Sequence, residues 1–197
     1  YFNWPTREEE AYVREHQKRM QMQVQKMMAD ETLRRIVSSH QGLMHPEEYS
    51  ERFLDKPEYF TALLVYCQAK GIPFSGYLRK LIGTKGKLPG MDAHWMEVLL
   101  QGVLYEDRES YAMTEAERES LLQKLKEAGA IYRNKVALRD NEAIKKVLMK
   151  SQGKMESIRT IVQTEYEALG NDLRLLVLCD YIKKDKLPEI GSKDTLV

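Results

Sequence analysis

The absence of glycine and proline between Pro5 and Gly42 constrains the fold of this chain more than any other feature. Such a stretch contains no residue that terminates a helix, and its apolar residues recur at helical spacing. Thr6 followed by Glu9 forms a capping box, in which each side chain accepts a hydrogen bond from the backbone of the other residue. We therefore predict a long helix that starts directly after Thr6. Asp30 belongs to a residue type that caps helices, so the helix is expected to divide there into two segments.

The rest of the chain carries further helix signals, and only 11 glycines and 6 prolines occur in 197 residues. Prolines at the first helical position, capping residues and terminal glycines mark where each helix starts or ends. The predicted fold is mainly α, a multi-helix domain with seven to nine helices. Besides a short helix from Pro46, helices are predicted over residues 57–71, 77–82, 92–105, 114–129, 140–150 and 154–169.

Two segments favour β structure. Residues 131–138, IYRNKVAL, alternate enough to form a short strand or a wing-like hairpin. Residues 173–179, LRLLVLC, are almost continuously apolar, as strands buried on both faces of a parallel sheet are. Such a strand needs neighbours, and the residues after it are polar and broken by proline and glycine. We therefore expect a helical domain over residues 1–150, and the incomplete start of an α/β domain over residues 151–197. The opening residues, which lack an initiator Met, also favour a piece of a longer polypeptide.

Several classes of protein and of site are excluded by the sequence. No apolar run approaches the ~20 residues of a membrane-spanning helix, so no membrane association is expected. Cys67 and Cys179 lie in apolar runs and are predicted to be reduced thiols of a cytoplasmic protein. His40 and His45 lack the partners of a zinc site. The loop GTKGK lacks the spacing of a phosphate-binding loop. We therefore predict no catalytic, cofactor-binding or metal-binding residue in this chain.

Charge is distributed unevenly along the chain, although its net value is only +1. Residues 59–91 contain five basic residues and no acid, residues 92–119 have a net charge of −6, and residues 123–150 have a net charge of +5. Such segregation can leave a basic surface that contacts phosphates, although faces that neutralise one another would have the same composition. The residues we predict to contact the backbone of DNA or RNA are Lys85, Lys87, Arg133, Lys135 and Arg139.

The last part of the chain resembles a known family. Residues 151–185, SQGKMESIRTIVQTEYEALGNDLRLLVLCDYIKKD, look like the entry into the second RecA-like lobe of superfamily II helicases, where a Lys-bearing helix precedes the first strand. The first residues, YFNWPTREEEAYV, are similar to the exit from a first lobe. The resemblance implies that residues 1–150 are a helical insertion between the two lobes of a helicase-like, ATP-dependent translocase.

The resemblance also defines what the chain lacks. It contains no Walker A Gly-Lys-Thr/Ser, no DEAD or DEAH box and no arginine-bearing motif VI. ATP and Mg²⁺ would therefore be bound by the parent protein, whose RecA-like lobes are the expected partners, and this chain is not expected to hydrolyse ATP. The alternative is a protein-interaction or structural helical module without a nucleic-acid role. The Met-rich first helix favours that alternative, because methionines form adaptable binding surfaces, unless they serve only as core.

Overall fold

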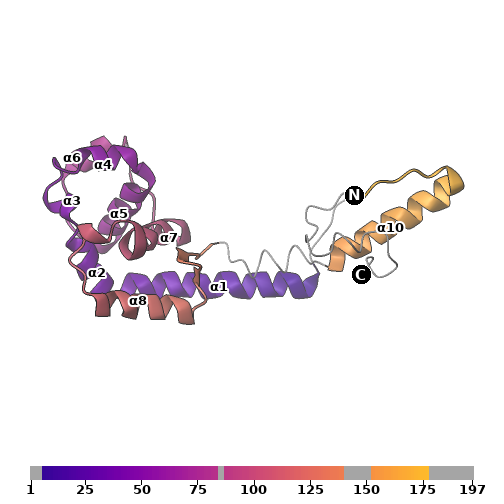
Figure 1. Ribbon diagram of the computed structural model, residues 1–197, viewed down its shortest axis with the longest axis horizontal. Helices are drawn as coiled ribbons and strands as arrows, with labels where there is room; N and C mark the ends of the chain where they lie inside the picture. Colours follow the sequence, from indigo (N-terminus) through magenta and orange to yellow (C-terminus); the bar gives the residue numbers. More distant parts are fainter. Residues whose placement is uncertain (1–5, 84–86, 140–151, 178–197) are drawn as a thin grey trace. The chain divides into compact units, whose positions relative to one another are not determined.

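The computed structural model describes residues 6–83, 87–139 and 152–177, and it is mainly α-helical as predicted (Figure 1). The described residues form nine α-helices, which agrees with the predicted seven to nine. The chain divides into two compact units. One comprises Pro5–Ser151, called the helical unit below, and the other comprises Gln152–Val197 with Tyr1–Trp4.

The helical unit contains eight described α-helices and one small sheet. Its α-helices are α1 (Arg7–Ala29), α2 (Glu31–Ser38), α3 (Gln41–Met44), α4 (Ser50–Asp55), α5 (Pro57–Lys70), α6 (Gly76–Leu81), α7 (Ala93–Gln101) and α8 (Glu115–Glu127). A π-helix, η1 (Gly102–Glu106), and a 3₁₀-helix, η2 (Arg108–Ser110), follow α7, and strands β1 (Ile131–Tyr132) and β2 (Lys135–Val136) follow α8. The second unit contains α10 (Gln152–Leu169) and the 3₁₀-helix η3 (Gly170–Asp172).

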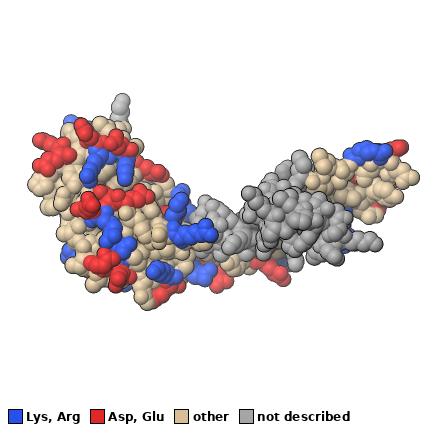
Figure 2. Space-filling model, in the orientation of Figure 1, with Lys and Arg blue, Asp and Glu red and all other residues tan. Residues whose placement is uncertain are grey.

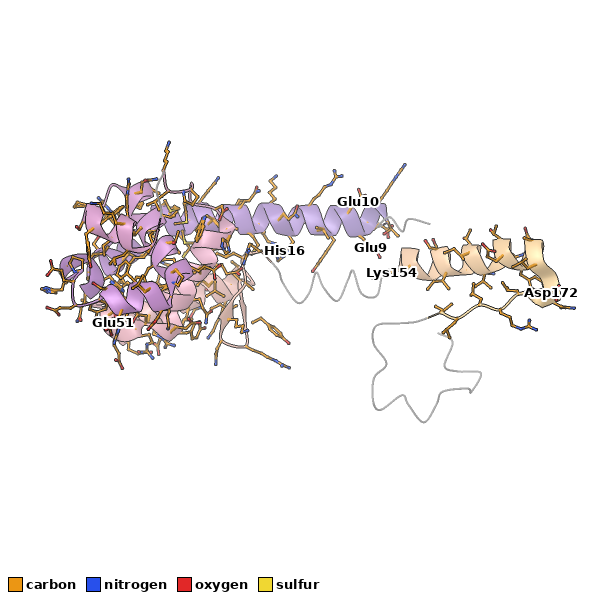
Figure 3. The ribbon with its side chains drawn as sticks, turned by 90° about the horizontal axis from the view of Figure 1, so that it is seen from above. Glu9, Glu10, His16, Glu51, Lys154 and Asp172 are labelled. Carbon is orange, nitrogen blue, oxygen red and sulfur yellow. The ribbon has the colours of Figure 1, made fainter. Side chains whose placement is uncertain are left out.

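The long stretch without glycine or proline forms two helices, with the break at Asp30. The Thr6–Glu9 capping box is present, with the Glu9 N–H donating to Thr6 Oγ1 at 3.2 Å and the Thr6 N–H donating to Glu9 Oε2 at 2.9 Å. The carboxylate of Asp30 accepts from the Leu33 N–H at 3.0 Å and starts α2. The first turns of α1, with Glu9 and Glu10, extend away from the helices around α5 (Figure 3). Their acidic side chains stabilise α1 through its dipole, and Glu9 also does so through the capping box.

Helix α5 lies at the centre of the core. Its residues from Ala62 to Cys67 are all fully buried, instead of forming a single apolar stripe. A helix that is apolar on all sides must be surrounded, and α5 packs against α7, α2 and α4. Burial raises the pKa of the Cys67 thiol to about 12, so it is a neutral core side chain. Met20 and Met27 of α1 are also buried in this core, while Met22 is 48% exposed.

The two segments with β character behave differently. Residues 131–138 contain a two-stranded antiparallel hairpin, in which Ile131 pairs with Val136 and Tyr132 pairs with Lys135. The strand predicted over residues 173–179 is not formed over 173–177, which have no regular secondary structure, and its last two residues lie outside the described residues. Within the described part of the chain no strand lies beside this segment to satisfy its backbone groups. The apolar pattern alone was therefore insufficient to predict a strand.

The helix predicted from Pro46 starts four residues later, at Ser50. Residues 46–49 form a turn, and the Ser50 hydroxyl donates to the Glu47 carbonyl at 2.8 Å. The Ser50 hydroxyl competes with backbone N–H groups for the carbonyls of the preceding residues. This competition explains why the helix does not extend through the turn.

Helix α8 offers a direct test of the capping box predicted at its start. The Glu117 N–H donates to Thr114 Oγ1 at 3.3 Å, and the Thr114 N–H donates to Glu117 Oε2 at 3.0 Å. We expect Thr114→Ala to lower the free energy of unfolding by about 1 kcal/mol, because the Glu117 N–H loses its acceptor and the Glu117 carboxylate loses the hydrogen bond from the Thr114 hydroxyl. Urea denaturation followed by circular dichroism measures this change. Ser120→Ala, at an exposed position in the same helix, should leave stability unchanged or slightly raised.

Candidate functional site

The π-helix η1 forms where α7 passes the ring of Tyr59. The backbone of Gly102 lies so close to this ring that an added Cβ would be within 2.7 Å of three of its carbon atoms. The backbone hydrogen bonds then join residues five apart, as in a π-helix, and the Asp107 N–H donates to the Gly102 carbonyl at 2.9 Å. The helix predicted over residues 92–105 is thus an α-helix that continues as a π-helix. Single π-helical turns often occur at functional sites, and this one ends beside a buried polar cluster.

Asp107 is the centre of that cluster, which we call the Asp107 network. Its Oδ2 lies 3.0 Å from His40 Nε2 and accepts a hydrogen bond from the Tyr59 hydroxyl at 3.1 Å. Its Oδ1 accepts from the Ser110 hydroxyl at 2.7 Å and forms an ion pair with Arg52 at 3.6 Å. The network therefore joins the start of α3, α4, α5 and η2 around one carboxylate.

The hydrogen bonds of His40 fix its tautomer. Its Nδ1 accepts from the Gly42 N–H at 2.9 Å, so Nε2 must carry the proton that is donated to Asp107. His40 is completely buried, and both ring nitrogens are occupied. It therefore holds the network together and has no nitrogen left to act as a general base.

The ionisation states of the other members follow from their surroundings. Burial alone would raise the pKa of Asp107, but hydrogen bonds from His40, Ser110 and Tyr59 hold it below its usual range. Burial raises the pKa of Tyr59 and Tyr111, whose hydroxyls bond each other, well above that of a free phenol. The network thus holds one carboxylate anion between neutral donors and the guanidinium of Arg52, an arrangement that suits a structural clamp better than acid–base catalysis.

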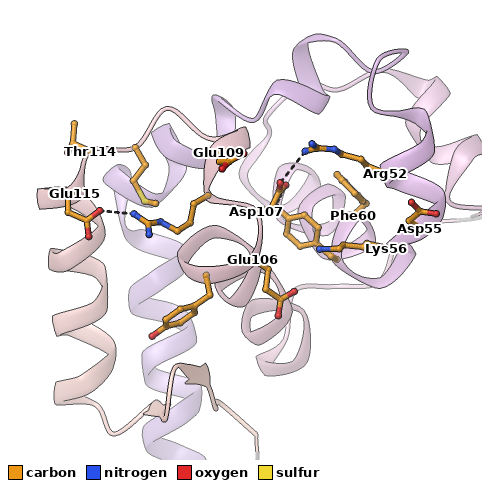
Figure 4. A pocket seen from close by; sticks show the side chains of 13 residues that line it. Arg52, Asp55, Lys56, Phe60, Glu106, Asp107, Glu109, Thr114 and Glu115 are labelled. Atoms are coloured by element: carbon orange, nitrogen blue, oxygen red, sulfur yellow. Dashed lines mark hydrogen bonds and ion pairs between the residues drawn. The ribbon is translucent and has the colours of Figure 1, made fainter.

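A pocket of about 700 Å³ opens beside the Asp107 network (Figure 4). One wall comes from the end of α4 and the start of α5, and the other from the segment between η1 and α8. Two ion pairs lie among its lining residues. Arg52 pairs with Asp107, and Arg108 pairs with Glu115 at 2.7 Å. The lining residues are Arg52, Asp55, Lys56, Tyr59, Phe60, Tyr105, Glu106, Asp107, Arg108, Glu109, Met113, Thr114 and Glu115.

A second hollow, of about 620 Å³, adjoins this pocket and extends to the hairpin. The two share Asp55, Lys56, Tyr59 and Glu106, and the second also includes Lys135 of β2. The two hollows therefore lie next to each other, and the second reaches one of the predicted nucleic-acid contacts.

The hairpin holds two of the predicted contact residues at its turn. Arg133 and Asn134 have positive φ values of 45° and 62°, as a two-residue hairpin turn requires at both central positions. The Arg133 guanidinium lies over the Tyr132 ring, 5.3 Å from its centroid. Arg133 and Lys135 are exposed, so an aromatic ring and two cations are presented together.

The other predicted contacts are less well placed or lie elsewhere. Arg139 forms an ion pair with Glu97 at 3.2 Å, and its backbone N–H donates to the same carboxylate. Lys87 is exposed in the segment between α6 and α7, and Lys85 lies outside the described residues. Of the five predicted residues, the hairpin brings together Arg133 and Lys135, and Arg139 serves to fasten the end of the hairpin to α7.

In the residues that the structure describes, no three His, Cys, Asp or Glu side chains gather as a metal site requires. Among the same residues, no helix combines the length and apolar character of a membrane span.

Comparison with protein-family models, with curated proteins and with solved structures found no match.

Proposed function

We propose that this chain is a helical accessory module of a helicase-like, nucleic-acid-dependent ATPase, and that it contacts the nucleic-acid backbone through its hairpin. The observation that supports this proposal best is the exposed turn with Tyr132, Arg133 and Lys135. ATP and Mg²⁺ would be bound by the rest of the parent protein, and the module would position the lobes of the motor.

The geometry of the hairpin suits phosphate contact. A two-residue turn is narrow and its backbone is fixed, so Arg133 and Lys135 are held close together without a large entropic cost. Cations of this kind neutralise phosphates without reading the base sequence. Helix α8, which precedes the hairpin, starts with Glu115, Glu117 and Glu119 and is poorly suited to the major groove of DNA. The proposal is therefore a sequence-independent contact.

Surface charge supports a local contact rather than a broad one. On the visible face of the helical unit, Lys and Arg side chains lie among Asp and Glu side chains (Figure 2). A large basic surface would bind nucleic acid through many weak contacts, whereas this surface favours a few defined ones. In the second unit, Tyr166, Leu169 and Leu176 are exposed, which supports an apolar surface that further parts of a parent protein would cover.

The test is a fluorescence-anisotropy titration with labelled duplex and single-stranded DNA and RNA, at several salt concentrations. We expect Arg133→Glu/Lys135→Glu to weaken binding at least about tenfold at low salt. The slope of log affinity against log salt should fall by roughly two, because two phosphate contacts are lost.

The matched control is Lys18→Glu/Lys80→Glu, which changes the net charge equally at two exposed positions in α1 and α6. This variant should keep most of the affinity and the full salt slope. Equal weakening by both pairs, or no binding by the unaltered chain at low salt, would rule out the hairpin contact.

A further inference from the structure

The pocket beside the Asp107 network retains unpaired negative charge. Five carboxylates and three cations line it. Asp107 and Glu115 are already paired with Arg52 and Arg108. Among the described residues, Asp55, Glu106 and Glu109 have no hydrogen-bond or ion-pair partner, and Lys56 is the remaining cation (Figure 4). The five carboxylates and three cations give the lining a net charge of −2, which favours a cation over a phosphate.

The pocket also has apolar and aromatic walls that suit the stem of a long basic side chain. Tyr59, Phe60, Tyr105 and Met113 line it together with the charged groups. Arginine and lysine bury their methylene stems on such surfaces and keep the charged group at the polar end. Aromatic faces also attract a guanidinium directly.

The walls are held in place before any ligand arrives. Tyr59 is fixed by its bonds to Asp107 and Tyr111, and its ring is packed on Gly102. The opposite wall is formed by the chain segment that begins at the end of the π-helix, whose last residue is Glu106. A preformed site avoids the entropic cost of ordering its own side chains on binding.

We infer that this pocket binds an arginine or lysine side chain of a basic segment in a protein partner. The adjoining hollow gives the backbone of such a segment a path towards the hairpin, and its lining includes Glu58 and Glu97, which are bonded to His94 and Arg139. A free small cation would use only the first pocket, so the second hollow beside it favours a peptide. The first pocket contains no residue of the proposed hairpin contact and does not depend on it, whereas the adjoining hollow is also lined by Lys135.

The test uses the full chain and a fluorescein-labelled nonapeptide of alternating glycine and arginine, measured by anisotropy. We expect saturable binding, which Glu106→Gln/Glu109→Gln weakens roughly fivefold or more, because two exposed charge pairs are lost. Lys56→Gln should strengthen binding about twofold, because it removes the one unpaired cation from the lining. Both glutamates are exposed and make no contact that the fold requires, so the variant is expected to fold normally.

The matched control is Glu47→Gln/Glu48→Gln, which removes the same charge from an exposed turn outside the pocket. It should change the affinity by less than about twofold. The inference is overturned if the control weakens binding as much as the pocket variant, or if the unaltered chain does not bind the peptide. It is also overturned if a labelled nonapeptide of alternating glycine and glutamate binds the chain as tightly as the arginine peptide.

Discussion

Gly102→Ala is expected to destabilise the helical unit by about 3 kcal/mol or more, a large fraction of the free energy of unfolding of a typical domain. The new methyl group would overlap the ring of Tyr59, which is almost fully buried and hydrogen-bonded at its hydroxyl end. The ring cannot turn aside without breaking its bonds to Asp107 and Tyr111. Overpacking and loss of hydrogen bonds therefore act together.

Urea denaturation measures this loss, with Gly76→Ala as the control. Gly76 is the first residue of α6, and nothing lies within 4 Å of an added Cβ there. That substitution should leave stability unchanged or raise it by up to about 1 kcal/mol, since alanine is the better helix former. If Gly102→Ala is as stable as the unaltered chain, the close approach of Tyr59 to η1 is wrong.

Asp107→Ala is expected to cost about 3–5 kcal/mol of stability. It leaves His40 Nε2–H and the hydroxyls of Tyr59 and Ser110 without their acceptor in the interior. Asp107→Asn keeps the shape but turns one acceptor into a donor that faces other donors, so it should cost about 2 kcal/mol. Asp55→Asn provides the control, because this exposed carboxylate lines the same pocket and should contribute less than about 0.5 kcal/mol.

The contribution of Asp107 should depend on pH in a defined direction. The pKa of Asp107 is lower in the folded chain than its ordinary value of 3.8, so the folded state binds the proton less readily than the unfolded state. The stabilisation is therefore fully present above pH 3.8 and is lost as the pH falls through the depressed pKa. The stability difference between the unaltered chain and Asp107→Asn should be constant at neutral pH and shrink in acid. A difference that is unchanged at pH 3 would contradict an ionised Asp107 in the network.

Local signals predicted most helix starts, with the exception of Pro46, which lies four residues before α4. The capping boxes at Thr6 and Thr114 and the start of α5 at Pro57 are all present in the structure. Each of these signals acts between residues no more than four apart, so it can be read from the sequence directly. The same holds for the break at Asp30, which divides one apparent helix into two.

The candidate site depends on contacts that have no local signal. His40 and Asp107 are 67 residues apart, and the sequence alone presented His40 only as a weak metal-ligand candidate. Gly102 was not singled out, because nothing near it in the sequence indicates that the ring of Tyr59 will pack on its backbone. The pocket is lined by residues that these long-range contacts bring together. It can therefore be recognised only in the folded structure. The hairpin was predicted as one of two alternatives, since a tight turn without glycine gives a weak signal.

The backbone conformation of Arg133 in that hairpin turn affects the stability of the turn. Left-handed backbone is unfavourable for any residue with a Cβ, by roughly 1–2 kcal/mol, and turns of this kind are usually occupied by asparagine and glycine. Here Asn134 follows that preference, whereas Arg133, with φ of 45°, does not. The chain thus retains a long cationic side chain at a position where glycine would make the turn more stable. Optimising this turn for folding alone would therefore favour glycine at position 133 and would remove the charge that the turn presents.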